Sequence, residues 1–234
     1  MEQAINWYAG IGSSKEDAPE DIQILIKRIA KILALSGYGL RSGGANKADT
    51  LFESGADDGY GWAKIYLPWN CFNKKRESVI NYYCGTTKYI LDASKFQNKS
   101  KALEFNKKYH PIGDKLNHSH AKLMARNAHQ VLGDSLEEPC KFIICWTSKF
   151  KLNDKKEIIS VSGGTGQAIR IAIDNNIPIY HLGYAPHRDL LEKRIAILED
   201  EIKLKQSKEP KNALEKMAEK AKEAVRGRRT FAGN

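Results

Sequence analysis

Three glycine-containing segments constrain the fold of this 234-residue chain more than any other feature. They lie at residues 10–14, 43–45 and 163–166, each after an apolar run and before an amphipathic stretch. Short glycine turns that lead from a strand into a helix are typical of β–α units, whose strands are parallel and whose crossovers are right-handed. The sequence therefore predicts an α/β fold in which helices flank a parallel sheet.

Apolar periodicity places strands and helices around these segments. Buried strands are predicted at residues 5–11, 38–42, 63–67, 142–146 and 178–182. Helices are predicted between Pro19 and Gly37 and at residues 48–58, 121–132 and 167–174. Strands and helices alternate along the chain, as they do in repeated β–α units.

Two stretches lack this alternation. Residues 70–118 are rich in Lys, Asn and Tyr and are predicted to form an insertion of short helices and loops. The polar stretch at residues 147–156 is predicted to be a mobile loop. We therefore expect one domain over residues 1–185, with the insertion at about 70–120, and a basic helical tail over residues 186–234.

The tail has its own apolar pattern. Leu191, Ile195, Leu198 and Ile202 follow one another at helical spacing, which is typical of a helical hairpin or a short coiled coil. We expect two helices here, which either dimerise or pack on the domain. A homo-oligomer is accordingly predicted.

Composition narrows the classes of function. The formal net charge is +10, from 38 Lys and Arg against 28 Asp and Glu, which favours anionic partners such as nucleotides or nucleic acid. The chain contains no apolar run of membrane-spanning length, so we expect a cytoplasmic protein without a membrane partner. The four cysteines form no CxxC pair, which indicates neither a zinc site nor a disulfide framework.

The glycine segments predict where a ligand binds. In an open parallel sheet, turns that follow strands lie at the carboxyl edge, where ligands occupy the topological switch point. Glycine lets the main chain approach an anion, and a following helix N-terminus supplies N–H donors and a positive dipole end. One such turn is as readily structural as functional, but three in one chain strengthen the functional interpretation. No GK[ST] or GxGxxG motif accompanies them, and the lack of GK[ST] argues against an ATP-hydrolysing motor.

Ordered motifs carry a family resemblance. YAGIGSS (8–14), LRSGGANKAD with FESGA (40–49, 52–56), RN within KLMARNAHQVLG (126–127) and SGGTGQAIRIA (162–172) follow one another along the chain. This series resembles the SLOG superfamily of Rossmann-like proteins, which includes the DNA-processing protein A family, the "lonely guy" phosphoribohydrolases and small phage-encoded members. The resemblance covers roughly residues 5–183 and implies a Rossmann-like, nucleotide-binding domain.

The resemblance implies particular site residues. Phosphate-binding main chain is expected at three turns, which comprise Gly12, Ser13 and Ser14, then Gly43 and Gly44, then Gly163, Gly164, Thr165 and Gly166. Arg126, followed by Asn127, matches the family's arginine, and a guanidinium holds phosphate with two parallel hydrogen bonds. Asp49 is expected either to accept a ribose hydroxyl or to interact with local N–H groups at a helix start.

Two positions depart from the family pattern. Lys47 stands where the second turn usually has another glycine, and it either narrows the pocket or adds a phosphate contact. The glutamate that assists ribosyl-bond cleavage in the phosphoribohydrolases is missing, because its place falls close to Arg170. If the protein is an enzyme, Glu53 or Asp49 would have to substitute for that acid. The sequence therefore favours binding over catalysis.

Aromatic and histidine side chains provide further candidates. Trp146 is the preferred residue for stacking on a base, with Trp69 and Tyr8 as alternatives, although tryptophans that end strands more often fill the core. Four histidines cluster loosely in the sequence, without a carboxylate or cysteine at ligand spacing, so no metal site is predicted. They are His110, His118, His120 and His129.

Three functions remain open at this point. The first is to capture, sense or sequester a phosphate-bearing nucleotide or a nucleotide-derived signalling molecule, which in a phage-type member implies an anti-defence role. The second is a DNA-processing-like recombination mediator, which binds single-stranded DNA and hands it to a recombinase; the net charge of +10 favours it. The third is hydrolysis of nucleoside monophosphates at the N-glycosidic bond. No cofactor is predicted for any of them.

Overall fold

A computed structural model describes residues 4–230, with side chains described through residue 207. The chain divides into two compact units, and the division falls between Ile195 and Ala196. The first unit contains all the strands that the structure describes. The second belongs to a single long helix, α6 (Ala185–Thr230), whose first turns lie in the first unit.

The first unit is built on a seven-stranded sheet with the order β4-β5-β3-β2-β1-β6-β9. Its strands are β1 (Asn6–Gly12), β2 (Tyr38–Ser42), β3 (Ala63–Leu67), β4 (Ser78–Asn81), β5 (Thr87–Asp92), β6 (Ile143–Trp146) and β9 (Ile179–His181). Every pairing is parallel except that of the edge strand β4 with β5. A separate antiparallel hairpin joins β7 (Phe150–Leu152) to β8 (Ile158–Val161).

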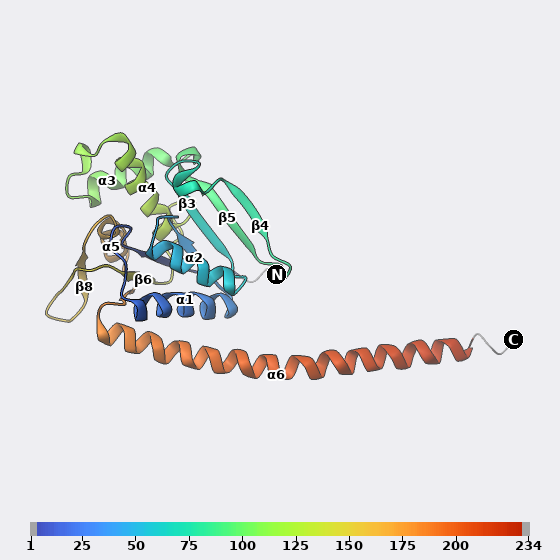
Figure 1. Ribbon diagram of the computed structural model, residues 1–234. Coiled ribbons are helices and arrows are strands. Elements are labelled where there is room, and N and C mark those ends of the chain that lie inside the picture. The colour runs from blue at the N-terminus through green and yellow to red at the C-terminus, as the bar shows by residue number, and fades with distance from the viewer. Residues whose placement is uncertain (1–3, 231–234) are drawn as a thin grey trace. The chain divides into compact units, whose positions relative to one another are not determined.

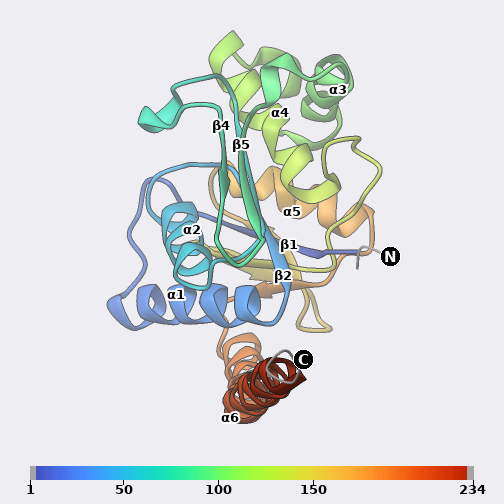
Figure 2. The same cartoon turned by 90° about the vertical axis from the view of Figure 1, so that its right-hand side faces the viewer.

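Helices cover both faces of this sheet (Figures 1 and 2). One face carries α1 (Glu20–Leu35) and α2 (Ala48–Asp58), and the other carries α3 (Lys99–Tyr109), α4 (His118–Leu132) and α5 (Thr165–Asp174). Short 3-10 turns are η1 (Phe72–Lys74), η2 (Ala93–Lys95) and η3 (Gly113–Lys115). The predicted α/β class, a mostly parallel sheet between helical layers, is confirmed.

Helix packing on the α1–α2 face depends on a glycine of the FESGA motif. A Cβ added at Gly55 would lie 2.3 Å from the carbonyl oxygen of Lys27. Only glycine therefore lets α2 approach α1 this closely without a shift of the backbone. This motif glycine has a packing role.

The strand order places a crevice near the middle of the sheet. From β1 the chain first builds outward through β2, β3 and β5, and then returns to add β6 and β9 on the opposite side. The order therefore reverses between β1 and β6. In open α/β sheets, the carboxyl ends of the strands at such a reversal border the ligand-binding crevice.

Three predictions about local structure differ from the fold. The stretch 70–118 contains two strands of the main sheet as well as α3, and the stretch 147–156 enters a hairpin in place of a loop. The tail contains one continuous helix where two were predicted. The strand β5 escaped prediction because it buries polar side chains: Lys88 lies inside, with its Nζ 2.7 Å from Asp57 Oδ2.

His181, at the end of β9, gives the fold a pH dependence. Its imidazole is fully buried, Nδ1 accepts a hydrogen bond from the Gly183 N–H at 3.0 Å, and Nε2 lies 2.9 Å from Thr147 Oγ1. Burial, together with the nearby His187, lowers the pKa of His181 to about 4. In the unfolded chain the same group titrates near pH ~6.5.

The unfolded state therefore binds more protons between these two pKa values, and the free energy of unfolding should fall as the pH drops from about 6.5 towards 4. We expect this decrease in the free energy of unfolding to be smaller in His181→Gln than in wild type, by up to about 3 kcal/mol. Urea unfolding at pH ~7.5 and ~4.5 measures the difference. An equal loss of unfolding free energy in wild type and variant would contradict this role of His181. The pH dependence that remains in the variant is attributed to other buried histidines such as His129.

Candidate functional site

A cavity of about 630 Å³ lies at the carboxyl end of β1. The first predicted turn, the start of α2, the RN motif of α4 and the turn before α5 all reach its lining. The predicted site residues that line it are Gly12, Ser13, Ser14, Asp49, Arg126, Asn127, Gly163, Gly164 and Thr165. The fold thus brings together residues that are more than 150 positions apart in the sequence.

Arg126 is a buried charged side chain in the lining of this cavity. Its side chain is only 8% exposed, and its Nη1 lies 3.5 Å from Asp49 Oδ2 and 3.3 Å from Gln130 Oε1. Its Nε is buried and has no hydrogen-bond partner among the described residues. A guanidinium has five N–H donors, and both observed contacts are at the long end of the hydrogen-bond range. Arg126 is therefore a buried cation with unused donor capacity.

Gly43 makes room for this guanidinium. A Cβ at position 43 would lie 1.0 Å from Arg126 Nη1, a distance at which the two atoms overlap. Gly43 and Gly44 themselves do not line the cavity. Gly44 adopts a φ of +66° and its carbonyl accepts a hydrogen bond from Asn73 Nδ2 at 3.0 Å. The second glycine turn therefore shapes the site by admitting an arginine, while Ala45 and Asn46 beside it reach the lining.

Asp49 links the second turn to Arg126. Its Oδ2 accepts the Ala45 N–H at 3.1 Å, which is the local role expected of an acidic residue at a helix start. The same oxygen faces Arg126 Nη1, and Asp49 also borders the cavity. Burial lowers the pKa of Arg126, while the charge of Asp49 and its hydrogen bond oppose that shift.

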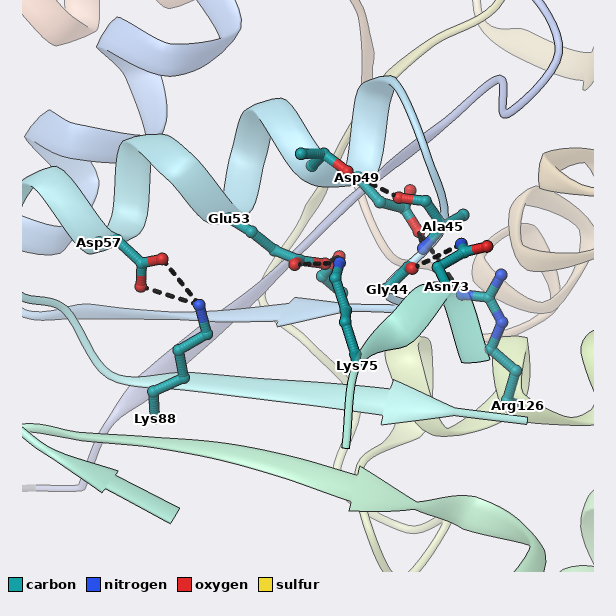
Figure 3. Close-up of polar contacts among 11 residues, drawn as sticks. Gly44, Ala45, Asp49, Glu53, Asp57, Asn73, Lys75, Lys88 and Arg126 are labelled. Atoms are coloured by element: carbon teal, nitrogen blue, oxygen red, sulfur yellow. Dashed lines mark hydrogen bonds and ion pairs between the residues drawn. The ribbon is translucent and has the colours of Figure 1, made fainter. Parts of the chain in front are cut away.

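Carboxylates recur at every turn of α2, and each meets a cation from another element (Figure 3). Asp49 faces Arg126, Glu53 Oε2 lies 2.5 Å from Lys75 Nζ, and Asp57 pairs with Lys88. Glu53 also accepts a hydrogen bond from Ser42 Oγ at 2.9 Å and does not line the cavity. Burial raises the pKa of Glu53, and Lys75 opposes that shift. Glu53 is thus held as a structural ion pair, away from the place where an acid catalyst would act.

The predicted stacking residue does not reach the cavity. Trp146 is 6% exposed and absent from the lining, although its carbonyl accepts the Ser13 N–H at 3.0 Å and fixes the first turn. Tyr8 is fully buried and stacks on Phe142. Both rings fill the core because their strands are central in the sheet. The aromatic ring that does line the cavity is Phe72, 5.9 Å from the Arg126 guanidinium carbon.

Contrary to prediction, the third glycine turn does not follow a strand of the main sheet. It follows β8 of the separate hairpin, not a strand of the parallel sheet, yet Gly163, Gly164 and Thr165 still line the cavity. Gly163 has a φ of +72°, and a Cβ there would meet no atom within 4 Å. Gly166 lies behind the turn, where a Cβ would approach the Val161 carbonyl oxygen to 2.9 Å. Gly166 therefore has a packing role.

One wall of the cavity comes mostly from the segment before the RN motif, for which no site residue was predicted. It is lined by His110, Leu116, His120, Leu123 and Met124, from the end of α3 to the first turns of α4. Burial, with Arg170 and His120 nearby, lowers the pKa of His110. His118 does not reach this cavity. No three His, Cys, Asp or Glu side chains of the described part of the chain gather as a metal site.

Lys47 takes neither role expected from the sequence. Its backbone adopts a φ of +67° and a ψ of −112°, where glycine is normally required, and its side chain does not line the cavity. The ammonium group donates to the Lys15 carbonyl oxygen at 2.7 Å and to Asp17 Oδ2 at 2.8 Å. Lys47 therefore holds the segment that follows the first turn by two hydrogen bonds, and its own backbone conformation is strained.

The fold and the cavity define an α/β protein of the Rossmann-like class with a cavity at the switch point. No protein-family model matches the chain, and no curated protein matches it in sequence. Within residues 4–230, the helices include none that is both long and apolar enough to cross a membrane.

Solved structures with a similar arrangement include the Moco carrier protein of Chlamydomonas reinhardtii, 13% identical, with 84% of this chain and 87% of that chain covered and a TM-score of 0.42. DNA processing protein A of Helicobacter pylori, described with a single-stranded DNA binding mode, is 14% identical over 75% of this chain and 64% of its own, with a TM-score of 0.41. The Streptococcus pneumoniae protein of the same name is 12% identical over 76% of this chain, with a TM-score of 0.42. This chain spans 50% of the pneumococcal chain.

The contact between Gly43 and Arg126 predicts a non-additive pair of substitutions. Gly43→Ala should lower the free energy of unfolding by roughly 2–4 kcal/mol, because the new methyl group displaces a buried cation from its partners. In an Arg126→Ala background the same change should cost less than about 1 kcal/mol, because the remaining close contact, Gln130 Cδ at 3.0 Å, belongs to a flexible side chain. Urea unfolding of the four proteins measures the coupling. Equal costs in both backgrounds would contradict this role of Gly43.

Two substitutions at Lys47 separate the effect of backbone strain from the effect of the ammonium contacts with Lys15 and Asp17. Lys47→Ala and Lys47→Gly both remove the contacts of the ammonium group, but only glycine relieves the positive φ. We expect the glycine variant to be more stable than the alanine variant by about 1 kcal/mol. Thermal and urea unfolding measure this difference. The reverse order would mean that the backbone at this position carries no strain.

Proposed function

We propose that the protein binds a phosphate-bearing nucleotide, or a nucleotide-derived molecule, in the cavity at the carboxyl end of β1. Arg126 carries this proposal. A buried guanidinium with two long contacts and an unpartnered Nε is costly unless a further acceptor completes its hydrogen bonding. A phosphate oxygen is such an acceptor, and its charge compensates the cation.

The surroundings of Arg126 suit the rest of such a ligand. The N-terminus of α5 meets the cavity through Gly163, Gly164 and Thr165, where main-chain donors and the helix dipole favour an anion. The volume of about 630 Å³ lies within the usual range for small-molecule sites. Phe72 and the apolar part of the α4 wall offer surfaces for a base, and Asp49 offers an acceptor for a ribose hydroxyl.

The two carboxylates that could substitute for the missing catalytic acid, Asp49 and Glu53, favour binding over N-glycosidic cleavage. Glu53 lies outside the cavity lining and is neutralised by Lys75. Asp49 borders the cavity, but its Oδ2 already accepts an N–H and faces Arg126. An acid or base at a glycosidic bond needs a carboxyl group that is free to exchange a proton with the substrate. Neither residue meets that requirement as it stands.

Isothermal titration calorimetry against a panel of mono-, di- and cyclic nucleotides tests the proposal. We expect one class to bind with a Kd well below millimolar, and Arg126→Ala to weaken that binding by about 10- to 100-fold, the effect of losing charge-assisted hydrogen bonds to a phosphate. Arg76→Ala, which removes an exposed arginine outside the lining, is the matched control and should bind like wild type.

The absence of binding across the panel, or equal binding by wild type and Arg126→Ala, would refute the proposed site. Single-stranded DNA is included in the panel because the net charge of +10 also favours it. An affinity for DNA that falls steeply with salt, unchanged in Arg126→Ala, would assign nucleic-acid binding to another surface.

A further inference from the structure

Three large apolar side chains lie exposed along α6 at intervals of seven residues. Leu190 is 47% exposed, Ile197 is 52% exposed and Leu204 is 55% exposed. Seven residues are close to two turns of an α-helix, so the three side chains form one stripe on this helix. The stripe differs from the seam predicted from the sequence, in which Leu191 and Ile195 are buried.

Charged residues flank the stripe in a pattern that is antisymmetric about its centre. Lys193 and Arg194 lie between Leu190 and Ile197, and Asp200 and Glu201 lie at the matching positions on the other side of Ile197; all four are exposed. Residues three and four positions from an apolar residue border it on the helix surface. One half of the stripe is therefore basic at its border and the other half is acidic.

We propose that this face of α6 binds a second copy of the same chain, with the two helices antiparallel and the two-fold axis at Ile197. Reversal of one helix about Ile197 places Leu190 opposite Leu204 of the other copy. The same reversal places the basic pair Lys193 and Arg194 opposite the acidic pair Asp200 and Glu201 of the other copy. A self-complementary patch of this kind is what an isologous dimer contact requires.

Charge also selects the direction of pairing. In a parallel pair with the same stripe at its centre, Lys193 would face Lys193 of the other copy and Asp200 would face Asp200. Like charges beside the seam of a helix pair disfavour that arrangement, whereas the antiparallel pair has only opposite charges there. Asp200 already pairs with Lys203 at 3.1 Å, but its side chain remains 78% exposed and accessible to a second cation.

Sedimentation velocity on the full chain over a range of concentrations tests the proposal. We expect a concentration-dependent dimer that Ile197→Lys weakens by about tenfold or more, because the substitution places a charge on the two-fold axis. Glu192→Lys, an exposed charge reversal outside the stripe and its flanking residues, is the matched control and should dimerise like wild type. A wild-type chain that stays monomeric up to millimolar concentration would overturn the proposal.

Charge reversal provides the sharper experiment. The Lys193→Glu/Arg194→Glu variant has acidic residues on both sides of Ile197, and the Asp200→Lys/Glu201→Lys variant has basic residues on both sides. Each should lose self-association, while an equimolar mixture of the two should form a heterodimer that high salt dissociates. Circular dichroism checks that both variants remain helical. Self-association by either variant alone, or no association in the mixture, would overturn the antiparallel pairing.

Discussion

The burial of Arg126 beside Asp49 is the constraint on which the candidate site depends. A buried cation must have a nearby anion, and its side chain needs space. Asp49, on α2, supplies the anion, and the missing side chain of Gly43 supplies the space. The guanidinium therefore ties α4, on one face of the sheet, to the start of α2, which packs on the other. The cavity forms where these two elements meet the end of β1.

The same principle repeats along α2. Glu53 and Asp57 lie one and two turns after Asp49, and they pair with Lys75 and Lys88. The partners come from the segment after β3 and from β5, so the pairs connect α2 to a stretch of the chain in which no strand was predicted. Removing one partner of a buried ion pair costs more free energy than the intact pair contributes to stability. These pairs therefore fix how the elements are arranged more than they add to the net stability of the fold.

The cavity and the helical stripe of α6 are separate features with different physics. Arg126, the main-chain turns and a largely apolar wall surround the cavity, an arrangement that suits a small anionic molecule with an apolar part. The stripe combines three apolar side chains with charges of both signs, an arrangement that suits another protein surface. The proposed ligand binding and the proposed self-association should therefore be independent of each other under substitution, since no residue takes part in both.

Sequence periodicity determined the fold class and most of the elements, because β1, β2, β3 and β6 are central strands whose side chains are mostly apolar. The glycine motifs and the RN pair indicated the neighbourhood of the cavity, since turns after parallel strands share one edge of a sheet. Residue patterns gave no sign of β5, whose buried Lys88 depends on a distant carboxylate, or of Phe72, which lies in a stretch without a periodic signal.

Only the tertiary structure decided which member of each motif faces the cavity. Gly43 and Glu53 stand in motifs beside the site, yet one makes space for Arg126 and the other pairs with Lys75. Trp146 ends a strand at the right edge, but its side chain fills the core. Local sequence determines backbone conformation and which side of an element is apolar, whereas the direction and contacts of a side chain depend on what distant segments place around it.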